Sequence, residues 1–442
     1  MNKLKNLLQD KLVRNFLNIF SGDAIGSVLS IVSISFVTKG IGMEKYGFIV
    51  LIQGIASLVD GIFNFQSWQG FIKFFPAVKE NDVGIKKLIK FSYILDIVTA
   101  LIAFIILNSA GMLIKKIYNF TPQEMFLLVI FSFYIIFNIQ GTPVGILRSY
   151  DRFDMLRNQR VITSIYNFIM LGVGFYLKLD LGYFVFVYLS SNILNGLLIN
   201  IFAIIVLKRR KLLGFIFEKS SFDKEFFKFT CLTNINSSLD IPVQYFDNLL
   251  IGKMLSLEQL GIYKICKTVA IVLDKVGTPI YQTLYPYFCE TIARKDVKEV
   301  FRKFLKVSVL LLGVCTVMVV GLNVVGFYLF SKFFSELVLN YKFEINLYII
   351  MKSLGTVFIA VHPLFLSLGY IKVETRIIFI ANLIYMGVLF PMIKNYGLSG
   401  VIAAYGVQVV LIVGMKMWYI LSKREKISFE NQDQDSSNDY YN

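Results

Sequence analysis

Charged residues interrupt an apolar stretch that is long enough to cross a membrane. The segment YKICKTVAIVLDKVG, residues 263–277, contains Lys264, Lys267, Asp274 and Lys275. A charged side chain at the centre of a bilayer costs about 2.5–3.5 kcal/mol on insertion scales, so it is tolerated where it meets water, an opposite charge or a charged ligand. The three lysines are therefore candidates for binding an anion, and Lys73, in another apolar stretch, is a fourth. The alternative is a structural network in which Lys264 extends to the membrane surface and Lys275 pairs with a carboxylate.

Polar residues recur at helical spacing in the neighbouring stretches. Alternating steps of four and three separate Gln53, Ser57, Asp60, Asn64 and Ser67, which places them on one face of a helix. The same steps separate Thr233, Ser237, Asp240, Gln244 and Asp247. Asp23 belongs to a weaker stripe, and Tyr281 extends the stripe that contains Lys267. Such faces in several helices predict a shared polar cavity.

The cavity candidates fall into two chemical groups. Neutral side chains that can form hydrogen bonds with a polar ligand are Gln53, Ser57, Asn64, Ser237, Gln244 and Tyr281. The carboxylates that could bind a coupling proton or Na⁺, or only balance the lysines, are Asp23, Asp60, Asp240, Asp247 and Asp274. His362 is the only histidine, and the four cysteines lack metal-ligand spacing, so we expect neither a metal nor another cofactor.

The composition is that of a protein with many membrane spans. It is 56% hydrophobic with a mean hydropathy of +0.66, and charged residues make up only 17%. Apolar runs of about 20 residues, enough to cross a bilayer, recur along the chain. We predict twelve spanning helices, at residues 15–38, 46–75, 87–110, 123–147, 160–178, 182–207, 228–252, 260–289, 304–330, 344–369, 375–394 and 398–421.

The positive charges predict the orientation of these helices. The net charge is +16, but it lies in short loops between apolar runs, which argues against a nucleic-acid partner. One set of alternate loops, with both termini, contains 30 lysines and arginines, and the other set contains 9. Because basic residues gather on the inner side, we expect both termini to be cytoplasmic.

An internal repeat divides the chain into halves. A shift of 214 residues aligns Glu44 with Glu258, Gly47 with Gly261 and Asp60 with Asp274, while Lys267 aligns with Gln53. A shift of 215 aligns three further pairs between residues 167–182 and 382–397. These matches predict six-helix lobes at 1–207 and 229–421, a cytoplasmic linker at 208–228 and a disordered cytoplasmic tail at 422–442. Parallel repeats of this kind are typical of transporters with a site between the halves.

The chain resembles the polysaccharide-exporting branch of the multidrug/oligosaccharidyl-lipid/polysaccharide superfamily. The resemblance spans residues 10–421 and rests on IGMEKYGFIVLIQGIASLVDG, its echo LSLEQLGIYKICKTVAIVLDK, and FDNLLIGKMLS. It implies a bacterial inner-membrane flippase that moves undecaprenyl-pyrophosphate-linked oligosaccharides, such as O-antigen units, by alternating access. The cavity lysines would then bind the pyrophosphate and the neutral side chains the sugars. Arginine, which related proteins also use, is absent from the stripes.

The resemblance also implies partners and alternatives. Membrane lipids and the lipid-linked oligosaccharide are the expected partners, with a polysaccharide polymerase and chain-length proteins as further candidates. A cation-coupled multidrug antiporter of the same superfamily is an alternative, although the lysines argue against a cationic cargo. A membrane polysaccharide polymerase is another, but the longest predicted outer loop, SKFFSELVLNYKFE, is short for a catalytic loop. The sequence contains no P-loop or nucleophile elbow, so we expect no enzymatic activity.

Overall fold

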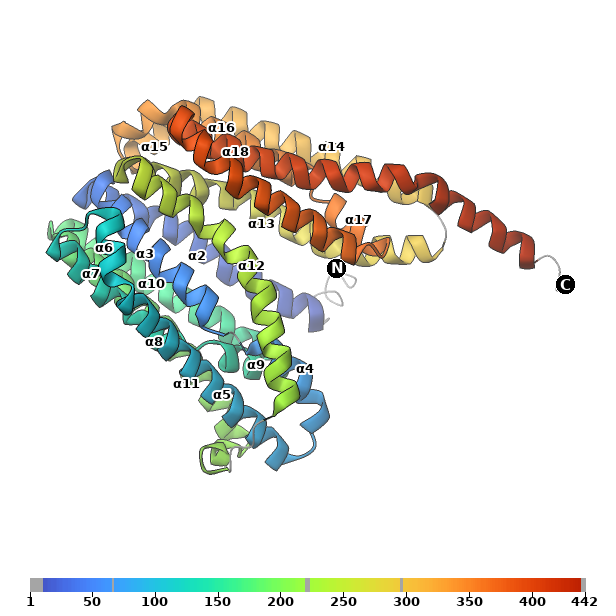
Figure 1. Cartoon of the computed structure of the whole chain (residues 1–442), viewed down its shortest axis with the longest axis horizontal. Helices are drawn as coiled ribbons and strands as arrows, with labels where there is room; N and C mark the ends of the chain where they lie inside the picture. The colour runs from blue at the N-terminus through green and yellow to red at the C-terminus, as the bar shows by residue number, and fades with distance from the viewer. Residues whose placement is uncertain (1–10, 66, 219–222, 295–296, 439–442) are drawn as a thin grey trace, which may run out of the picture. The chain divides into compact units, whose positions relative to one another are not determined.

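The structure is helical throughout the part of the chain that it describes. This computed structural model describes residues 11–65, 67–218, 223–294 and 297–438, and it contains no strand within them. Figure 1 shows the helices, which confirm the predicted all-α fold. By their contacts they form two compact units, Met1–Gly261 and Ile262–Asn442.

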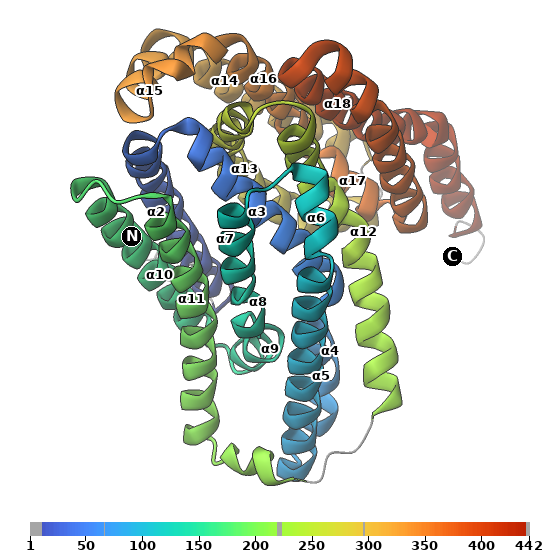
Figure 2. The ribbon, with the colours of Figure 1, turned by 60° about the vertical axis from the view of Figure 1, so that its left-hand side comes forward.

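The first unit contains the helices that precede residue 262. They are α2 (Lys11–Ile41), α3 (Met43–Phe63), α4 (Trp68–Val78), α5 (Asp82–Ser109), α6 (Gly111–Tyr118), α7 (Pro122–Ser132), α8 (Tyr134–Phe137), α9 (Gly141–Ser149), α10 (Phe153–Tyr176), α11 (Leu181–Arg209), the 3-10 turn η1 (Leu213–Phe217) and α12 (Lys224–Met254). Helix α2 packs along α10, and α3 packs along α12. Figure 2 shows α11 leading into η1, which lies beside α5.

The second unit contains most of α13 (Leu257–Ala293), whose first residues belong to the first unit. It continues with α14 (Val297–Gly321), the π-helical segment η2 (Leu322–Gly326), α15 (Phe327–Phe333), the 3-10 helix η3 (Glu336–Tyr341), α16 (Lys342–Val357), α17 (Val361–Ser367) and α18 (Ile371–Asn438). Figure 1 shows α14, α16 and α18 running side by side, in agreement with their contacts.

Each unit has its own apolar core. In the first, Phe71, Ile89, Leu207 and Phe226 are fully buried and pack together, so that α12 closes the core formed by α4, α5 and α11. In the second, Phe288 of α13 packs with residues of α14 and α17. Large side chains buried in this way fix the helices that carry the polar residues.

About twelve helical segments span the membrane. Among the described residues, eight segments meet a strict criterion of length and hydropathy. The remaining predicted spans correspond to α10, α12, α13 and the part of α18 after Gly397, where φ is 58° and ψ is −135°. Helices α12 and α13 carry polar stripes, which lower their hydropathy without shortening them. Helices α12 and α13 are therefore long enough to span the membrane but less apolar than the other spans.

Three predicted spans are broken by non-helical residues, which corrects the sequence prediction. The span predicted at 46–75 ends as a helix at Phe63 and begins again at Trp68. Asn64 between them has extended backbone angles, φ −88° and ψ 102°. The span predicted at 123–147 stops as a helix after Phe137 and resumes at Gly141. The span predicted at 344–369 stops as a helix at Val357 and resumes at Val361. The stripe in the first of these therefore ends at a break, where Asn64 and Ser67 lie.

The structure has helix within the predicted linker and the predicted tail, whose bounds stay a prediction. Much of the segment 208–228 is helical, because η1 lies within it and α12 begins at Lys224. Helix α18 continues to Asn438, although we expected disorder from residue 422. Residues 422–438 contain no glycine or proline that would end a helix. The lobe boundaries stay a prediction, because they follow the repeat and not the contact-based units.

The helix junctions agree with the repeat. Helices α2 and α3 meet at Gly42, where φ is 87°, and α12 and α13 meet at Leu255 and Ser256. A shift of 214 aligns Gly42 with Ser256. The same break therefore occurs at the same place in both copies.

Candidate functional site

A buried carboxylate joins the two broken helices of the first unit. Asp60, 8% exposed, lies one turn before the end of α3. Its Oδ1 accepts a hydrogen bond from Asn64 Nδ2 at 2.9 Å, and its Oδ2 accepts one from Asn138 Nδ2 at 2.5 Å. Asn64 also donates to the backbone oxygen of Asn138, and Gln140 donates to the Asn138 side chain. The side-chain amides of Asn64 and Asn138 thus hold the Asp60 carboxylate at the point where both spans are interrupted.

A second buried carboxylate lies nearby at the starts of two half-helices. Asp96 of α5 is 1% exposed. Its Oδ2 accepts hydrogen bonds from the backbone nitrogen and the hydroxyl of Thr142, both at 2.7 Å, and its Oδ1 accepts one from the backbone nitrogen of Ser67 at 3.3 Å. These nitrogens belong to the first turns of α9 and α4, where amide groups lack partners inside the helix. Asp96 therefore caps both segments at once.

Non-helical backbone at membrane depth requires such partners. A backbone group without a hydrogen bond in the hydrocarbon region is costly, so broken helices occur where protein or a water-filled cavity satisfies them. Ser67 and Thr142 also bond to each other through their hydroxyls at 3.1 Å. Discontinuous helices of this kind form ion and substrate sites in several transporter folds. Asp60 is the predicted site residue that the structure places in this setting.

The other predicted residues of the first unit are spread along α3, α4 and α12. Ser57, half-buried, shares side-chain hydrogen bonds with Tyr134 and Tyr245. Gln53 is half-buried, Gln244 is exposed and Asp247 is 3% exposed. The side chains of Asp23, Ser237 and Asp240 lie outside the described residues.

Lys73 does not join the Asp60 cluster. It is exposed on α4, and its Nζ lies 3.8 Å from the ring centroid of Phe229 on α12 and 5.5 Å from that of Phe74. A cation over aromatic rings is attracted to their faces. This contact accounts for the position of Lys73 without a ligand.

In the second unit, Asp274 is paired with a lysine from another helix. Lys352 Nζ of α16 lies 2.8 Å from Asp274 Oδ1 of α13. Their side chains are 24% and 53% exposed, so the pair is partly open. Lys352 also shares a side-chain hydrogen bond with Tyr405 of α18. The pair gives one carboxylate of the predicted stripe a cationic partner on another helix.

Lys267 stands at one end of a row of tyrosines. Its Nζ lies 4.8 Å from the ring centroid of Tyr263, one turn earlier in α13. The Tyr263 ring meets the edge of Tyr348 at 5.6 Å, and Tyr348 stacks on Tyr405 at 5.5 Å. Because Tyr405 bonds to Lys352, the row connects two lysines on different helices. These rings hold the ammonium groups in place without neutralising them.

The remaining lysines of the stripe are also partly accessible. Lys264 and Lys275 are half-buried on α13, as is Lys267. Half-buried ammonium groups inside a spanning helix retain some access to water or to a ligand, as the prediction required. The three therefore form a cationic set along one helix, with Asp274 as its acidic member.

Tyr281 belongs to a separate polar cluster near the start of α18. Its ring stacks on His362 at 5.2 Å, and His362 Nδ1 contacts Glu374 Oε1. Lys416 Nζ donates to the same oxygen at 2.6 Å and lies 2.9 Å from His362 Nδ1. Glu374 and Lys416 are 5% and 3% exposed. This cluster encloses a buried ion pair between the two halves of α18.

Sequence reasoning missed several of these partners. Asp96, Asn138, Glu374 and Lys416 carry most of the buried polar contacts, yet none lies on a predicted stripe. The run NIQGTP at 138–143 offered a signal, because a polar pair followed by glycine and proline disfavours continuous helix. Among the described residues no group of three or more His, Cys, Asp or Glu side chains could hold a metal ion.

Comparisons with known proteins agree on a family and a fold. Residues 12–292 match the family model described as Polysaccharide biosynthesis protein. The inner membrane protein YghQ of Escherichia coli (strain K12) is 25% identical over 284 residues, which cover 62% of this chain and 79% of YghQ.

Solved structures of transporters share the fold. One, described as the inward-facing conformation of a multidrug resistance MATE family transporter of the MOP superfamily, has a TM-score of 0.72 at 14% identity and covers 92% of this chain and 96% of its own. MATE in the bent conformation has a TM-score of 0.60 at 16% identity, with 96% of each chain covered. At these identities the likeness establishes the fold.

Proposed function

This chain belongs to the polysaccharide biosynthesis protein family, and on that premise we propose that it is a flippase for a lipid-linked oligosaccharide. It is a multi-pass inner-membrane protein with the fold of MOP-superfamily transporters. Its cargo would be an undecaprenyl-pyrophosphate-linked unit of O-antigen or a similar surface polysaccharide. Alternating access would move the cargo from the cytoplasmic to the outer leaflet.

The observation that carries this proposal is the cationic set on α13. Lys264, Lys267 and Lys275 are half-buried inside a spanning helix, and the nearby acid Asp274 is paired with Lys352. A pyrophosphate would be attracted to such a set of ammonium groups, and half-buried lysines within a span can still be reached by a ligand. Lysine binds phosphate as a point charge, without the two parallel hydrogen bonds that arginine can form. This weaker binding suits a cargo that must be released. Lys73, which contacts Phe229, is a weaker candidate for the same role.

The remaining predicted residues complete the proposal. Gln53, Ser57, Asn64, Ser237, Gln244 and Tyr281 would bind sugar hydroxyls or line the path. Asp60 is the favoured residue for a coupling proton or Na⁺, because it is buried at the broken helices and accepts its hydrogen bonds from neutral amides. Asp23, Asp240 and Asp247 are further candidates, whereas Asp274 already balances Lys352.

The cargo also defines the partners. The prenyl tail would remain in the bilayer, so membrane lipids are part of the path. A flipped repeat unit has to be joined to others on the outer side, which makes a polysaccharide polymerase and chain-length proteins the expected neighbours. We propose that both termini lie in the cytoplasm, in keeping with the charge bias of the loops.

The test uses a matched pair of lysines. Lys267 lies over Tyr263 at 4.8 Å, and Lys332 of α15 lies over Tyr328 at 6.0 Å, so each contacts a tyrosine one turn earlier. In cells that lack the chromosomal copy, K267A should abolish most of the surface polysaccharide, and K332A should not. K267R should restore part of the signal because it retains the charge. Normal surface polysaccharide with K267A would refute the role of Lys267.

The solved structures favour a second candidate, a cation-coupled multidrug antiporter. The MATE transporter with a TM-score of 0.72 is described as a multidrug resistance protein. Such a protein would carry cationic compounds, which the lysines of α13 would repel. Efflux of a cationic dye from vesicles containing the purified protein separates the two. We expect no efflux above empty vesicles, and dye efflux with intact surface polysaccharide in the deletion strain would support the antiporter.

A further inference from the structure

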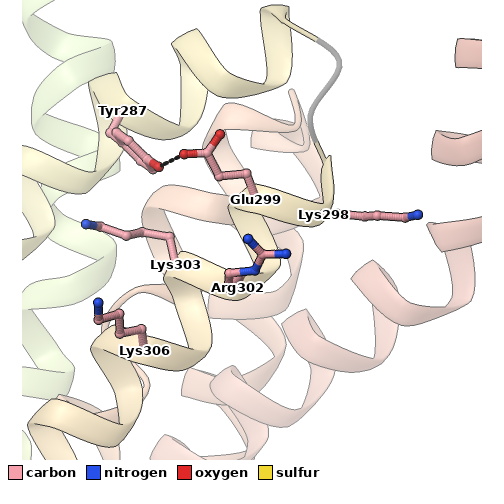
Figure 3. Close-up of a pocket in the computed structure, with 6 residues that line it drawn as sticks. All are labelled: Tyr287, Lys298, Glu299, Arg302, Lys303 and Lys306. Carbon is pink, nitrogen blue, oxygen red and sulfur yellow. Dashed lines mark hydrogen bonds between the residues drawn. The ribbon is translucent and has the colours of Figure 1, made fainter.

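A cationic pocket lies at the junction of α13 and α14, away from the residues discussed above. It has a volume of about 490 Å³. Figure 3 shows its lining, which combines one aromatic residue of α13 with five charged residues from the first turns of α14: Tyr287, Lys298, Glu299, Arg302, Lys303 and Lys306. Among the described lining residues, four are therefore cationic and one is acidic.

The pocket has fixed internal contacts. The Tyr287 hydroxyl donates a hydrogen bond to Glu299 Oε1 at 2.5 Å, which ties α14 to α13. Lys303 Nζ lies 5.3 Å from the centroid of the same tyrosine ring. Figure 3 shows Lys303 and Lys306 extending to the same side of α14, while Lys298 extends to the other. Tyr287 thus helps to fix the position of Glu299, and the described lining keeps an excess of positive charge.

The charge pattern is unfavourable for the helix by itself. Arg302 and Lys306 are four residues apart, so two like charges are neighbours on the helix surface. They also lie near the N-terminal end of α14, where the helix dipole favours negative charge. An anion in the pocket would relieve both effects. Because these charges are exposed, a ligand can reach them.

The apolar face beyond the pocket indicates what kind of anion. Leu305 is 59% exposed and Val309 67% exposed, and both follow directly along α14. Among the eight apolar spanning segments of the described chain, the one that contains α14 has the smallest buried share. Its exposed apolar surface therefore suits contact with lipid. A ligand with a negatively charged head and apolar chains would contact both the cationic pocket and the apolar face beside it. A free anion would contact the pocket alone.

We propose that this pocket binds the phosphate headgroup of an anionic phospholipid of the surrounding bilayer, with its acyl chains along Leu305 and Val309. Basic clusters next to a spanning helix attract anionic lipids, each cation adding to the affinity. The loop charge bias predicts that this end of α14 faces the cytoplasm, so the lipid would come from the inner leaflet. The site is separate from the proposed cargo site, and its test does not measure transport.

The test measures lipid binding to the purified full-length protein in detergent. Short-chain phosphatidylglycerol is the probe, and short-chain phosphatidylcholine is the neutral comparison. The triple variant R302Q/K303Q/K306Q should raise the apparent Kd for phosphatidylglycerol by at least about tenfold. The control K208Q/R209Q/K211Q removes the same charge from exposed residues at the end of α11 and should change Kd by no more than about twofold.

A fourth variant keeps the test valid if the triple variant folds poorly. E299Q removes the acid found among the described lining residues, while its amide oxygen can still accept the hydrogen bond from Tyr287, so it should tighten phosphatidylglycerol binding. Unchanged binding in both E299Q and the triple variant would overturn the proposal. Equal losses in the triple variant and its control would also overturn it, because the attraction would then be general. Inorganic pyrophosphate binding as tightly as phosphatidylglycerol would show an anion site without a lipid.

Discussion

Gly47 lies so close to the backbone carbonyl of Leu257 that no side chain fits between them. The repeat aligns Gly47 with Gly261, and Gly261 in turn lies against Met43, which the repeat aligns with Leu257. Swapping the two copies of the repeat turns the first contact into the second, as expected for packing about a local twofold axis. All four residues belong to the first contact-based unit. Close approach of the starts of α3 and α13 therefore supports the internal repeat.

This contact predicts different outcomes for two glycines of one helix. A Cβ at Gly47 would overlap the Leu257 carbonyl, whereas a Cβ at Gly54 would lie 3.6 Å from the nearest atom of Asn248, an ordinary contact. G47A should therefore lower the free energy of unfolding by about 1–3 kcal/mol. G54A should leave it unchanged or raise it by up to about 1 kcal/mol, because alanine favours helix. Thermal unfolding of the purified protein in detergent measures both, and equal midpoints would contradict the close contact.

The double cap at Asp96 predicts a large loss of stability when its oxygens are removed. D96A would leave the backbone nitrogens of Ser67 and Thr142 without an acceptor in a buried site. Each unsatisfied buried group costs about 1–3 kcal/mol, so the variant should lose at least about 2 kcal/mol of unfolding free energy. D96N keeps one acceptor oxygen and should lose less.

The control for Asp96 is a carboxylate outside the spans. Asp154 pairs with Arg152 at 2.7 Å, but their side chains are 38% and 29% exposed. D154A should change the unfolding free energy by less than about 1 kcal/mol, because exposed ion pairs contribute little. If D154A were as destabilising as D96A, general sensitivity of the protein would explain both results.

The buried pair of Glu374 and Lys416 predicts that one substitution is worse than two. Among the described residues, K416M would leave Glu374, 5% exposed, in contact with His362 but without its lysine partner. Breaking a buried ion pair typically costs about 3–5 kcal/mol, whereas replacing both partners is often close to neutral. The double variant E374Q/K416M should therefore unfold at a higher temperature than K416M. A double variant less stable than the single one would show that Lys416 is not there to neutralise Glu374.

The sequence predicted the helical class and the number of spans, because these depend on local hydropathy and on the helical repeat. The role of the lysines on α13 stays a prediction. The sequence prediction failed where distant residues cooperate. The break at Asn64 arises because Asp60, Asn138 and Asp96, from three helices, supply hydrogen bonds that the spans give up. A continuous apolar run gives no sign of such partners. Likewise, His362 and Lys416 are 54 residues apart, and nothing local predicts that they meet.

Substitutions of Asp274 and Lys352 can distinguish two roles for Asp274, which are to balance the charge of Lys352 or to bind a coupling ion. If Asp274 only balances Lys352, 2.8 Å away, removing both charges should leave transport largely intact. We therefore expect D274N/K352M to retain surface polysaccharide within about threefold of the wild type, a change of less than about 1 kcal/mol. K352M alone should lower the amount further, since it leaves a negative charge among the lysines that would bind an anion. D60N, which removes a carboxylate that neutral amides hold, should abolish the signal if Asp60 couples an ion. Loss of polysaccharide in D274N/K352M with normal protein levels would instead assign the coupling role to Asp274.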